Sequence, residues 1–401
     1  MVAQQTAGLP TVARQMAVLQ MAVLQMAAHQ GKILMNLKKH LQKLTELHSP
    51  SGHEGNVRSY LRDAWAKLVD DLQVSALGNL IGVKYGTGKK PRRRIMLCAH
   101  MDEIAMIVAE VRDGYVRLND LVGSDGRIMQ AKSVIVHGKR PLTGVVAAVP
   151  PHISNTTGDG KKVYPELSDQ WVDLGLPAEE VMELVSVGDL VTMDAPLLEL
   201  KNGFVAGKAM DNRASVAAVS YCLELLQKRT HWWDIYAVAS VQEEVGYYGA
   251  ITAAHAINPD LAITLDVTFA KQPGVNDDFT QELGKGAVIC VGPNFHQRFV
   301  DEVLTLSKQI EIPLHVEPLP GKSGTDAWAI QVAQQGIPTI LLSIPIRNMH
   351  TPVETVSLKD IKRTGRLIAE LISQLDDEFL EKLRWQREKK ESSEDENDDD
   401  E

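Results

Sequence analysis

Five short apolar runs, set between segments of helical periodicity, dominate the pattern of hydrophobic and polar positions along this chain. Runs of this length between helical stretches are typical of buried strands in an α/β fold. Each run is followed, directly or within a few residues, by a side chain of a type that binds metal ions. The five runs are 95–99, 205–210, 235–241, 261–265 and 339–345.

Helical periodicity occupies much of the remaining chain. Leucines recur on one face near the start of this pattern, at Leu37, Leu41, Leu44 and Leu47. Helices are also predicted over 215–227, 297–309 and 358–385. The predicted fold class is therefore α/β, with a sheet whose strand ends can share one functional edge, as open α/β sheets do.

The texture of the sequence changes between 105 and 204. Strand-length runs alternate there with turns rich in Gly, Asp and Pro, which predicts a small all-β unit. Because metal-binding residue types lie on both sides of it, this unit is interpreted as an insertion. The α/β domain is then discontinuous, built from 35–104 and 205–388.

The two ends of the chain differ from both units. Between Gln15 and Leu24 the unit QMAVL occurs twice in tandem. We interpret 1–34 as a dispensable extension or a misassigned translation start, in preference to a poor signal peptide or an extra amphipathic helix. The dense acidic run in 389–401 predicts a disordered, solvated tail.

Composition excludes some classes of function. The formal net charge is −10, which argues against general nucleic-acid binding, since that needs a basic face. No apolar stretch reaches the ~20 residues that span a bilayer. Cys98, Cys222 and Cys290 are scattered in apolar contexts without a CxxC pair. They predict buried free thiols in a reducing compartment, and we expect a cytoplasmic location.

The residues after the five runs suggest a metal centre. Taken singly, each has an ordinary explanation, such as a helix N-cap or a solvated strand end. Together His100, Asp211, Glu244, Asp266 and His350 supply five nitrogen or oxygen ligands. If Asp211 bridges, each of two metal ions receives three protein ligands. Such donors without thiolate suit Zn, Co or Mn.

Two further residues complete the predicted site. Asp102 points the same way as His100 and can accept a hydrogen bond from the ring nitrogen that does not bind metal. Glu243 and Glu244 are adjacent, and successive side chains diverge, so we expect different roles for them. Glu243 is left as the general base. Without metal, so many carboxylates would raise the pKa of one another.

In this order, the residues resemble those of the TET-type dinuclear metallo-aminopeptidases, metallopeptidase family forty-two, which includes glutamyl and deblocking aminopeptidases. The matching segments are AHMDEIA (99–105), GKAMDNRAS (207–215), VQEEVGYYGA (241–250), LDVTFA (265–270), GTDA (324–327) and IPIRNMHTPVE (344–354).

The resemblance implies a zinc-exopeptidase-like domain, a mixed sheet sandwiched by helices, with a β-barrel-like dimerisation domain at 105–204. It implies that His100, Asp211 and Asp266 hold one metal and that Asp211, Glu244 and His350 hold the other. By the same resemblance, Glu243 is the base and Asp102 supports His100. Members commonly form dimer-based twelve-subunit shells.

The expected function is removal of N-terminal residues from peptides, with attack by a hydroxide that bridges two metals. A glycosidase that uses Glu243 and Glu244 as its carboxylate pair is an alternative. It is disfavoured because such pairs flank a bond at ~5–10 Å while adjacent side chains diverge. A catalytically silent, peptidase-like scaffold is the other alternative, and the complete set of ligands and base weighs against it.

Overall fold

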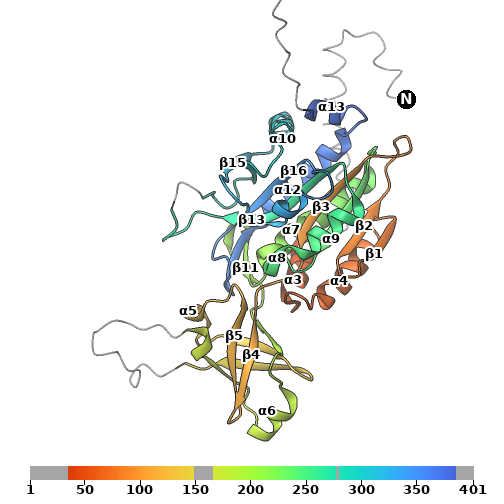
Figure 1. The fold of residues 1–401 in the computed structure, drawn as a ribbon. Helices are drawn as coiled ribbons and strands as arrows, with labels where there is room; N and C mark the ends of the chain where they lie inside the picture. Colours follow the sequence, from red (N-terminus) through yellow and green to blue (C-terminus); the bar gives the residue numbers. More distant parts are fainter. Residues whose placement is uncertain (1–34, 149–165, 277–279, 385–401) are drawn as a thin grey trace, which may run out of the picture.

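The structure is a computed structural model that describes residues 35–148, 166–276 and 280–384. The predictions for 1–34 and for the acidic tail at 389–401 concern residues outside these ranges. The described chain forms a large sheet with helices on both faces and a separate small barrel (Figure 1).

The large sheet has eight strands, and its four central strands run parallel to one another. The carboxyl ends of those four strands therefore meet at one edge. In spatial order the strands are β1 (Asp71–Val74), β2 (Leu80–Lys84), β12 (Asp234–Ser240), β3 (Arg94–His100), β13 (Leu261–Phe269), β16 (Thr339–Ile346), β14 (Ala287–Val291) and β15 (Leu314–Pro318).

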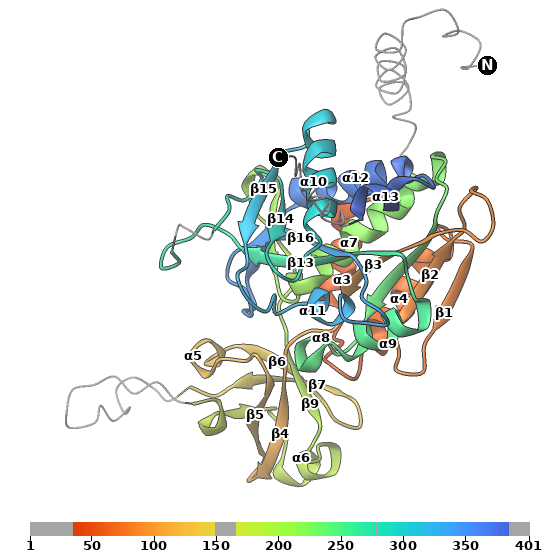
Figure 2. The ribbon, with the colours of Figure 1, turned by 45° about the horizontal axis from the view of Figure 1, so that its top comes forward.

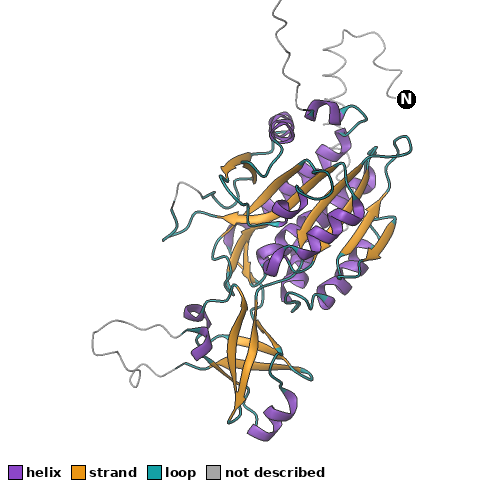
Figure 3. Ribbon diagram, viewed as in Figure 1, coloured by secondary structure: helices purple, strands orange, loops and turns teal. Residues whose placement is uncertain are grey.

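Helices cover both faces of this sheet (Figure 3). In β3, Ile95 and Leu97 pack into the larger core while Met96 and Cys98 pack into the smaller one, as the period of two requires. The larger core includes α3 (Leu37–Glu46), α4 (Gly55–Trp65), α7 (Met210–Leu225), α10 (Gln297–Gln309), α12 (Leu358–Gln374) and α13 (Phe379–Leu383). The smaller core includes α9 (Tyr248–Ile257) and α11 (Asp326–Ile330).

The barrel closes on itself and has its own apolar core. Its strands, in order around the barrel, are β4 (Ala105–Arg112), β5 (Tyr115–Val122), β8 (Trp171–Asp173), β7 (Pro141–Val146), β6 (Ser133–His137) and β9 (Leu190–Met193). Two short helices, α5 (Gly126–Met129) and α6 (Ala178–Leu184), accompany it. Both views place the barrel on the side of α8 (Glu243–Gly246) (Figures 1 and 2).

One expectation about the sheet was wrong. The run 205–210 was expected to be a strand like the other four, but it is divided between a small sheet and a helix. The small sheet has three strands, β10 (Leu198–Glu199), β11 (Phe204–Gly207) and β17 (Glu354–Ser357). The antiparallel pairing of β11 with β17 brings the segment before Asp211 next to the segment after His350.

Two helix boundaries also differ from the predictions. The helix predicted over 358–385 is broken, because α12 ends at Gln374 and the chain turns before α13. The turn is held by Asp376, whose carbonyl accepts from Trp233 Nε1 at 3.0 Å and whose carboxylate accepts from the backbone N–H of Glu378 at 3.1 Å. The helix expected from 215 begins at Met210. The α/β class with a small all-β insertion is confirmed.

Candidate active site

The predicted ligands converge at the carboxyl edge of the central strands. His100 is the last residue of β3, and Asp266 lies near the end of β13. Glu243 and Glu244 follow β12, and His350 follows β16. Asp211 comes from the first turn of α7, where its backbone is not helical (φ −75°, ψ 104°). Topology therefore brings together residues that lie up to 250 positions apart in the chain.

Asp211 lies between the two histidines. Its Oδ1 is 3.2 Å from His100 Nε2, and its Oδ2 is 3.4 Å from His350 Nε2. Each histidine also faces one further carboxylate: Asp266 Oδ1 is 3.9 Å from His100 Nε2, and Glu244 Oε2 is 3.7 Å from His350 Nε2. The two sets, which share Asp211, each place their ligand-type atoms within 4.8 Å of one another.

Glu243 occupies the His100 side of this cluster, with Oε2 at 3.7 Å from His100 Nε2. The two glutamates do not end the strand, because β12 stops at Ser240 and they form the first turn of α8. Gln242, with φ +57°, makes the change of direction between strand and helix. A non-glycine residue in this conformation is uncommon and often marks a functional site.

Asp102 contacts both His100 and the backbone of Glu243 and Glu244, and it is fully buried. Its Oδ1 is 3.3 Å from His100 Nδ1, although the alignment falls short of a hydrogen bond. Its carboxylate also accepts from Ser51 Oγ at 2.6 Å and from the backbone N–H groups of Glu243 and Glu244, each at 3.2 Å. Asp102 thus positions the start of α8 as well as facing the imidazole.

Burial and mutual repulsion disfavour the charged forms of the site acids. Burial raises the pKa of Glu243 well above its usual range, and Asp266 and the neighbouring Glu244 add to this while His100 opposes it. Burial and Asp211 raise the pKa of Glu244 in the same way. Burial also raises the pKa of Asp266, with a further contribution from Asp211. The direction is the one expected for clustered carboxylates without a nearby cation.

The histidines stabilise one acid selectively. Burial would raise the pKa of Asp211, but its contacts with His100 and His350 outweigh this and lower it. Burial alone would lower the pKa of His100, yet Glu243, Asp102 and Asp211 raise it well above its usual range. An acidic site of this kind attracts positive charge, whether a proton or a metal ion.

Asp326 is a buried acid near the site that was not among the predicted site residues. Its Oδ2 accepts from Ser240 Oγ at 2.6 Å and lies 3.4 Å from Cys98 Sγ. Burial raises its pKa to about 6. The helix that begins at Asp326 is capped by Thr325, whose Oγ1 accepts from the backbone N–H of Ala327 at 3.3 Å. Nothing in the spacing of GTDA distinguished these two roles.

The barrel also contacts this edge. Gly123, in the turn after β5, has φ +73°, and a Cβ at this position would lie 2.7 Å from Ile104 Cγ2 and 3.0 Å from His350 Nδ1. Only glycine adopts this conformation readily and leaves the space. The inserted barrel therefore limits the space around one candidate ligand.

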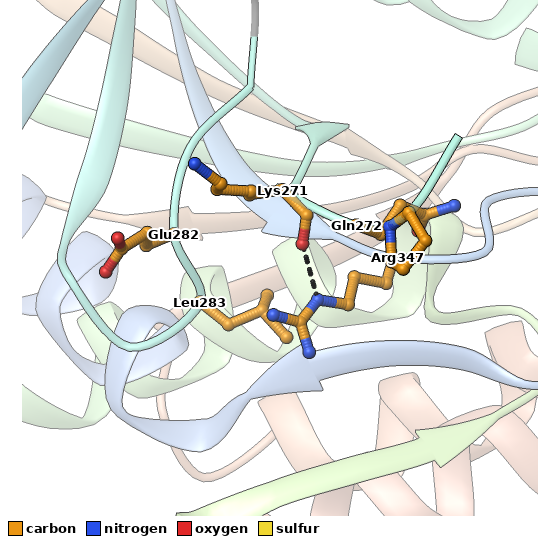
Figure 4. A pocket seen from close by; sticks show the side chains of 6 residues that line it. Lys271, Gln272, Glu282, Leu283 and Arg347 are labelled. Carbon is orange, nitrogen blue, oxygen red and sulfur yellow. Dashed lines mark hydrogen bonds between the residues drawn. The ribbon is translucent and has the colours of Figure 1, made fainter. Parts of the chain in front are cut away.

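The loops that lead to His350 and away from Asp266 are tied together beside an open pocket (Figure 4). Arg347 Nε donates to the carbonyl of Lys271 at 2.8 Å, and the backbone N–H of Asn348 donates to Gln272 Oε1 at 2.8 Å. Glu282 and Leu283 line the same pocket. These contacts hold the chain after β16 against the chain after β13.

The cluster fits divalent metal ions. Its donors are imidazole nitrogens and carboxylate oxygens, which suit Zn, Co and Mn. Glu244 Oε1 is buried and has no hydrogen-bond partner within the described structure. A buried carboxylate oxygen without a partner is costly unless a cation satisfies it. The fold and this site together define an α/β protein with a candidate centre for divalent metal ions at the carboxyl ends of its central strands.

Comparison with known proteins specifies the class further. The family model described as M42 glutamyl aminopeptidase matches residues 78–367. The chain belongs to this family, and it is accordingly a hydrolase that acts as an exopeptidase.

Similar proteins support the assignment over nearly their full length. The lysyl aminopeptidase of Pyrococcus furiosus is 35% identical, over 84% of this chain and 96% of the relative. A TET aminopeptidase from a marine sediment Thaumarchaeota archaeon has a TM-score of 0.81 at 31% identity, covering 87% of this chain and 99% of that one. The TET1 peptidase of Pyrococcus horikoshii has a TM-score of 0.75 at 29% identity, covering 85% and 100%.

Within the described ranges, no helix combines the length and apolar character needed to cross a membrane.

Proposed function

We propose that this protein is an aminopeptidase that removes N-terminal residues from peptides with the help of two divalent metal ions. The single observation that carries the proposal is the placement of Asp211, whose two oxygens face two different histidines at 3.2 and 3.4 Å. A carboxylate in this position can bridge two ions. His100 and Asp266 would complete one ligand set, and Glu244 and His350 the other.

When bound, the ions supply Lewis-acid polarisation of the scissile carbonyl and an acidified water. Glu243 would take the proton from the attacking water and deliver it to the leaving amine. Its position suits this role, because Glu243 Oε2 lies on the His100 side of the cluster, 3.7 Å from His100 Nε2. Asp102 would position His100 and, through two backbone N–H groups, the base itself.

The two alternatives raised by the sequence are less well supported. A silent scaffold requires a missing ligand or base, whereas all seven residues lie at one edge of the sheet. A glycosidase built on Glu243 and Glu244 would not need the two histidines that share this cluster with them. Sensitivity of turnover to a chelator separates the metal-dependent peptidase from both.

We further propose that the protein is a homo-oligomer built from dimers, with the barrel at the dimer contact. Support comes from the Pyrococcus horikoshii peptidase, which can assemble into a tetrahedron or a large octahedral shell. The buried free thiols at 98, 222 and 290 favour a reducing compartment, such as the cytoplasm.

The test is Glu243→Gln, assayed on zinc- or cobalt-loaded protein with a panel of aminoacyl chromogenic substrates. We expect metal content to remain unchanged and kcat to fall by ~10²–10⁴-fold, the contribution typical of a positioned base. Glu370→Gln is the matched control, since Glu370 is also buried, at 4% exposed, but lies on α12 and pairs with Arg229 and Arg366, which are not candidate ligands. Turnover of the Glu243 variant near that of the control contradicts the role of Glu243.

A further inference from the structure

Glu354 lies four residues after His350, at the first position of β17, and it is only 2% exposed. Its Oε1 accepts from the backbone N–H of His350 at 2.7 Å, and its Oε2 accepts from the backbone N–H of Asp211 at 3.0 Å. One carboxylate therefore holds the main chain of two candidate ligands that are 139 positions apart in the sequence. Neither the strand pattern nor the spacing of the motif assigned it a role.

The two main-chain segments that Glu354 joins lack regular backbone structure at the residues concerned. Asp211 has non-helical angles within the first turn of α7, and His350 has φ +60°. Regular helix or strand geometry therefore does not set the backbone direction at either residue. The contact from Glu354 satisfies both N–H groups and fixes their separation at the span of one carboxylate.

The small sheet extends this constraint. Glu354 is directly opposite Gly207 in the pairing of β17 with β11, so it is anchored to the strand that leads into Asp211. The side-chain atoms that would face the same ion, Asp211 Oδ2 and His350 Nε2, lie 3.4 Å apart. A shift of either segment would change this distance, because Glu354 bonds to the main chain of both residues.

We propose that Glu354 is a positioning residue, which sets the relative placement of Asp211 and His350 and so the geometry of the metal site that these two residues share with Glu244. This inference rests on the proposed two-metal function. Glu354 would act through the main chain and would not itself touch the substrate.

Asp360 provides an unusually close control. It is fully buried, and its two oxygens likewise accept from two backbone N–H groups, those of Gly284 at 2.6 Å and Gly286 at 3.0 Å. It lies in α12, and its partners are not candidate ligands. Its amide variant removes a carboxylate bridge of the same type without affecting the metal site.

The experiment titrates zinc alone into the metal-free, full-length protein by calorimetry, and compares Glu354→Gln, Glu354→Asp and Asp360→Asn with the wild type. An amide has only one acceptor oxygen, so Gln can keep only one of the two hydrogen bonds. Its NH₂ group would face the second backbone N–H group, and neither of these groups can accept. We expect zinc affinity at one of the two sites to fall by ~10- to 100-fold, as for other residues that orient ligands. Asp360→Asn should lower the melting temperature but leave both affinities within twofold.

Glu354→Asp distinguishes position from charge. It keeps the negative charge but is shorter by one methylene, so it cannot reach both N–H groups in the same geometry. We expect it to weaken the same zinc site and to change the visible spectrum of the cobalt-loaded protein. If the Glu354→Gln protein does not fold, the zinc affinity of the Glu354→Asp protein alone tests the proposal.

Wild-type zinc affinity in a folded Glu354→Gln or Glu354→Asp protein overturns the positioning role while leaving the proposed function intact. A wild-type protein that binds no zinc overturns both. Loss of affinity in Asp360→Asn equal to that in the Glu354 variants also overturns the proposal, because the effect would then reflect general stability.

Discussion

Two adjacent acids, Asp102 and Glu103, enter two buried charge clusters of opposite kinds. Asp102 faces the candidate metal site, where the ion-pair contacts of the carboxylates are, in the described ranges, all with histidines. Glu103 is 2% exposed and accepts from Lys208 Nζ at 2.6 Å and from the backbone N–H of Ser49 at 2.8 Å. Among the described residues, the carboxylates of the metal-site cluster have no ion pair with a lysine or arginine, whereas Glu103 has one with Lys208.

The second cluster, which we call the brace, consists of Glu103, Lys208 and Arg213. Arg213 Nη2 is 3.5 Å from Glu103 Oε1, and its Nη1 donates to the carbonyl of Leu44 at 2.6 Å. Burial raises the pKa of Glu103, but Lys208 and Arg213 outweigh this and lower it below its usual range. The comparison shows that the protein can offset the burial of an acid with its own cations, as it does for Glu103. The pKa values of Glu243, Glu244 and Asp266 stay raised, so the charged forms of these acids need a bound cation.

The largest expected effect comes from breaking the compensated cluster. Lys208→Met leaves Glu103 buried without its closest cation, and we expect unfolding free energy to fall by about 3–5 kcal/mol, as when one partner of a buried pair is removed. Denaturant titration measures this. Lys38→Met is the control, because Lys38 pairs with Glu199 on the surface and should contribute only about 0–1 kcal/mol. A loss below about 1 kcal/mol at Lys208 would show that the brace is not compensated as described.

The next effect is that of adding metal to the uncompensated cluster. Zinc that binds only the folded state stabilises it by about 2.7 kcal/mol at a concentration of 100 times its Kd. We therefore expect the melting temperature of the metal-free protein to rise with zinc and to return on chelation. In Asp211→Asn, which weakens the shared ligand, the rise should be much smaller. Equal shifts in both proteins would place the binding elsewhere.

The third effect is a dependence of that stabilisation on pH. Glu243, Glu244 and Asp266 have raised pKa values in the folded, metal-free protein. The folded state then holds more protons than the unfolded state above the ordinary value of about 4.3 for Glu. Stability of the metal-free protein therefore falls as pH rises, by about 1.4 kcal/mol per pH unit for each proton involved.

Metal displaces these protons, so the metal-loaded protein lacks this loss. We expect the difference in unfolding free energy between loaded and metal-free protein to grow from pH 5 towards pH 7. Taking this difference removes the contribution of titrating histidines outside the site, because that contribution is the same with and without metal. His48 is one of them, and burial lowers its pKa to about 4. A difference that is constant over this range contradicts the raised pKa values.

The smallest effect has the opposite sign to the first. Glu244→Gln removes one buried acid whose charged form has no compensating cation, and we expect the metal-free protein to become more stable by about 1 kcal/mol, comparable to one unit of pKa shift. Zinc affinity should fall at the same time, in the manner of other sites where function and stability compete. Glu103→Gln should instead destabilise. A metal-free Glu244→Gln protein with lower stability than wild type would remove the distinction between the clusters.

Much of the fold could be predicted from local sequence. The runs that became β3, β12, β13 and β16 are apolar throughout, because both faces of a central parallel strand are buried. The insertion was visible as a change from helical to strand-length spacing. The assignment of 205–210 failed because a short apolar run carries no record of its pairing partner, and β11 pairs with β17 instead of the large sheet.

The ligand types could be predicted because each follows a strand whose carboxyl end meets the others. The supporting residues could not. Glu103, Lys208 and Arg213 are charged, and their burial becomes understandable only when the three are seen in contact. Glu354 and Asp326 have no local pattern that separates them from ordinary strand-start and helix-start acids.

The sequence by itself determined the α/β class, the inserted β unit and the chemical types gathered at the strand ends, since these depend on local periodicity and on the order of elements. Only the tertiary structure decided that Asp211 faces both His100 and His350, that Asp102 also holds the start of α8, and that Glu354 joins two distant segments. The physical reason is that a hydrogen bond or a shared ligand joins atoms a few ångströms apart, and the sequence records no distance between residues 139 positions apart.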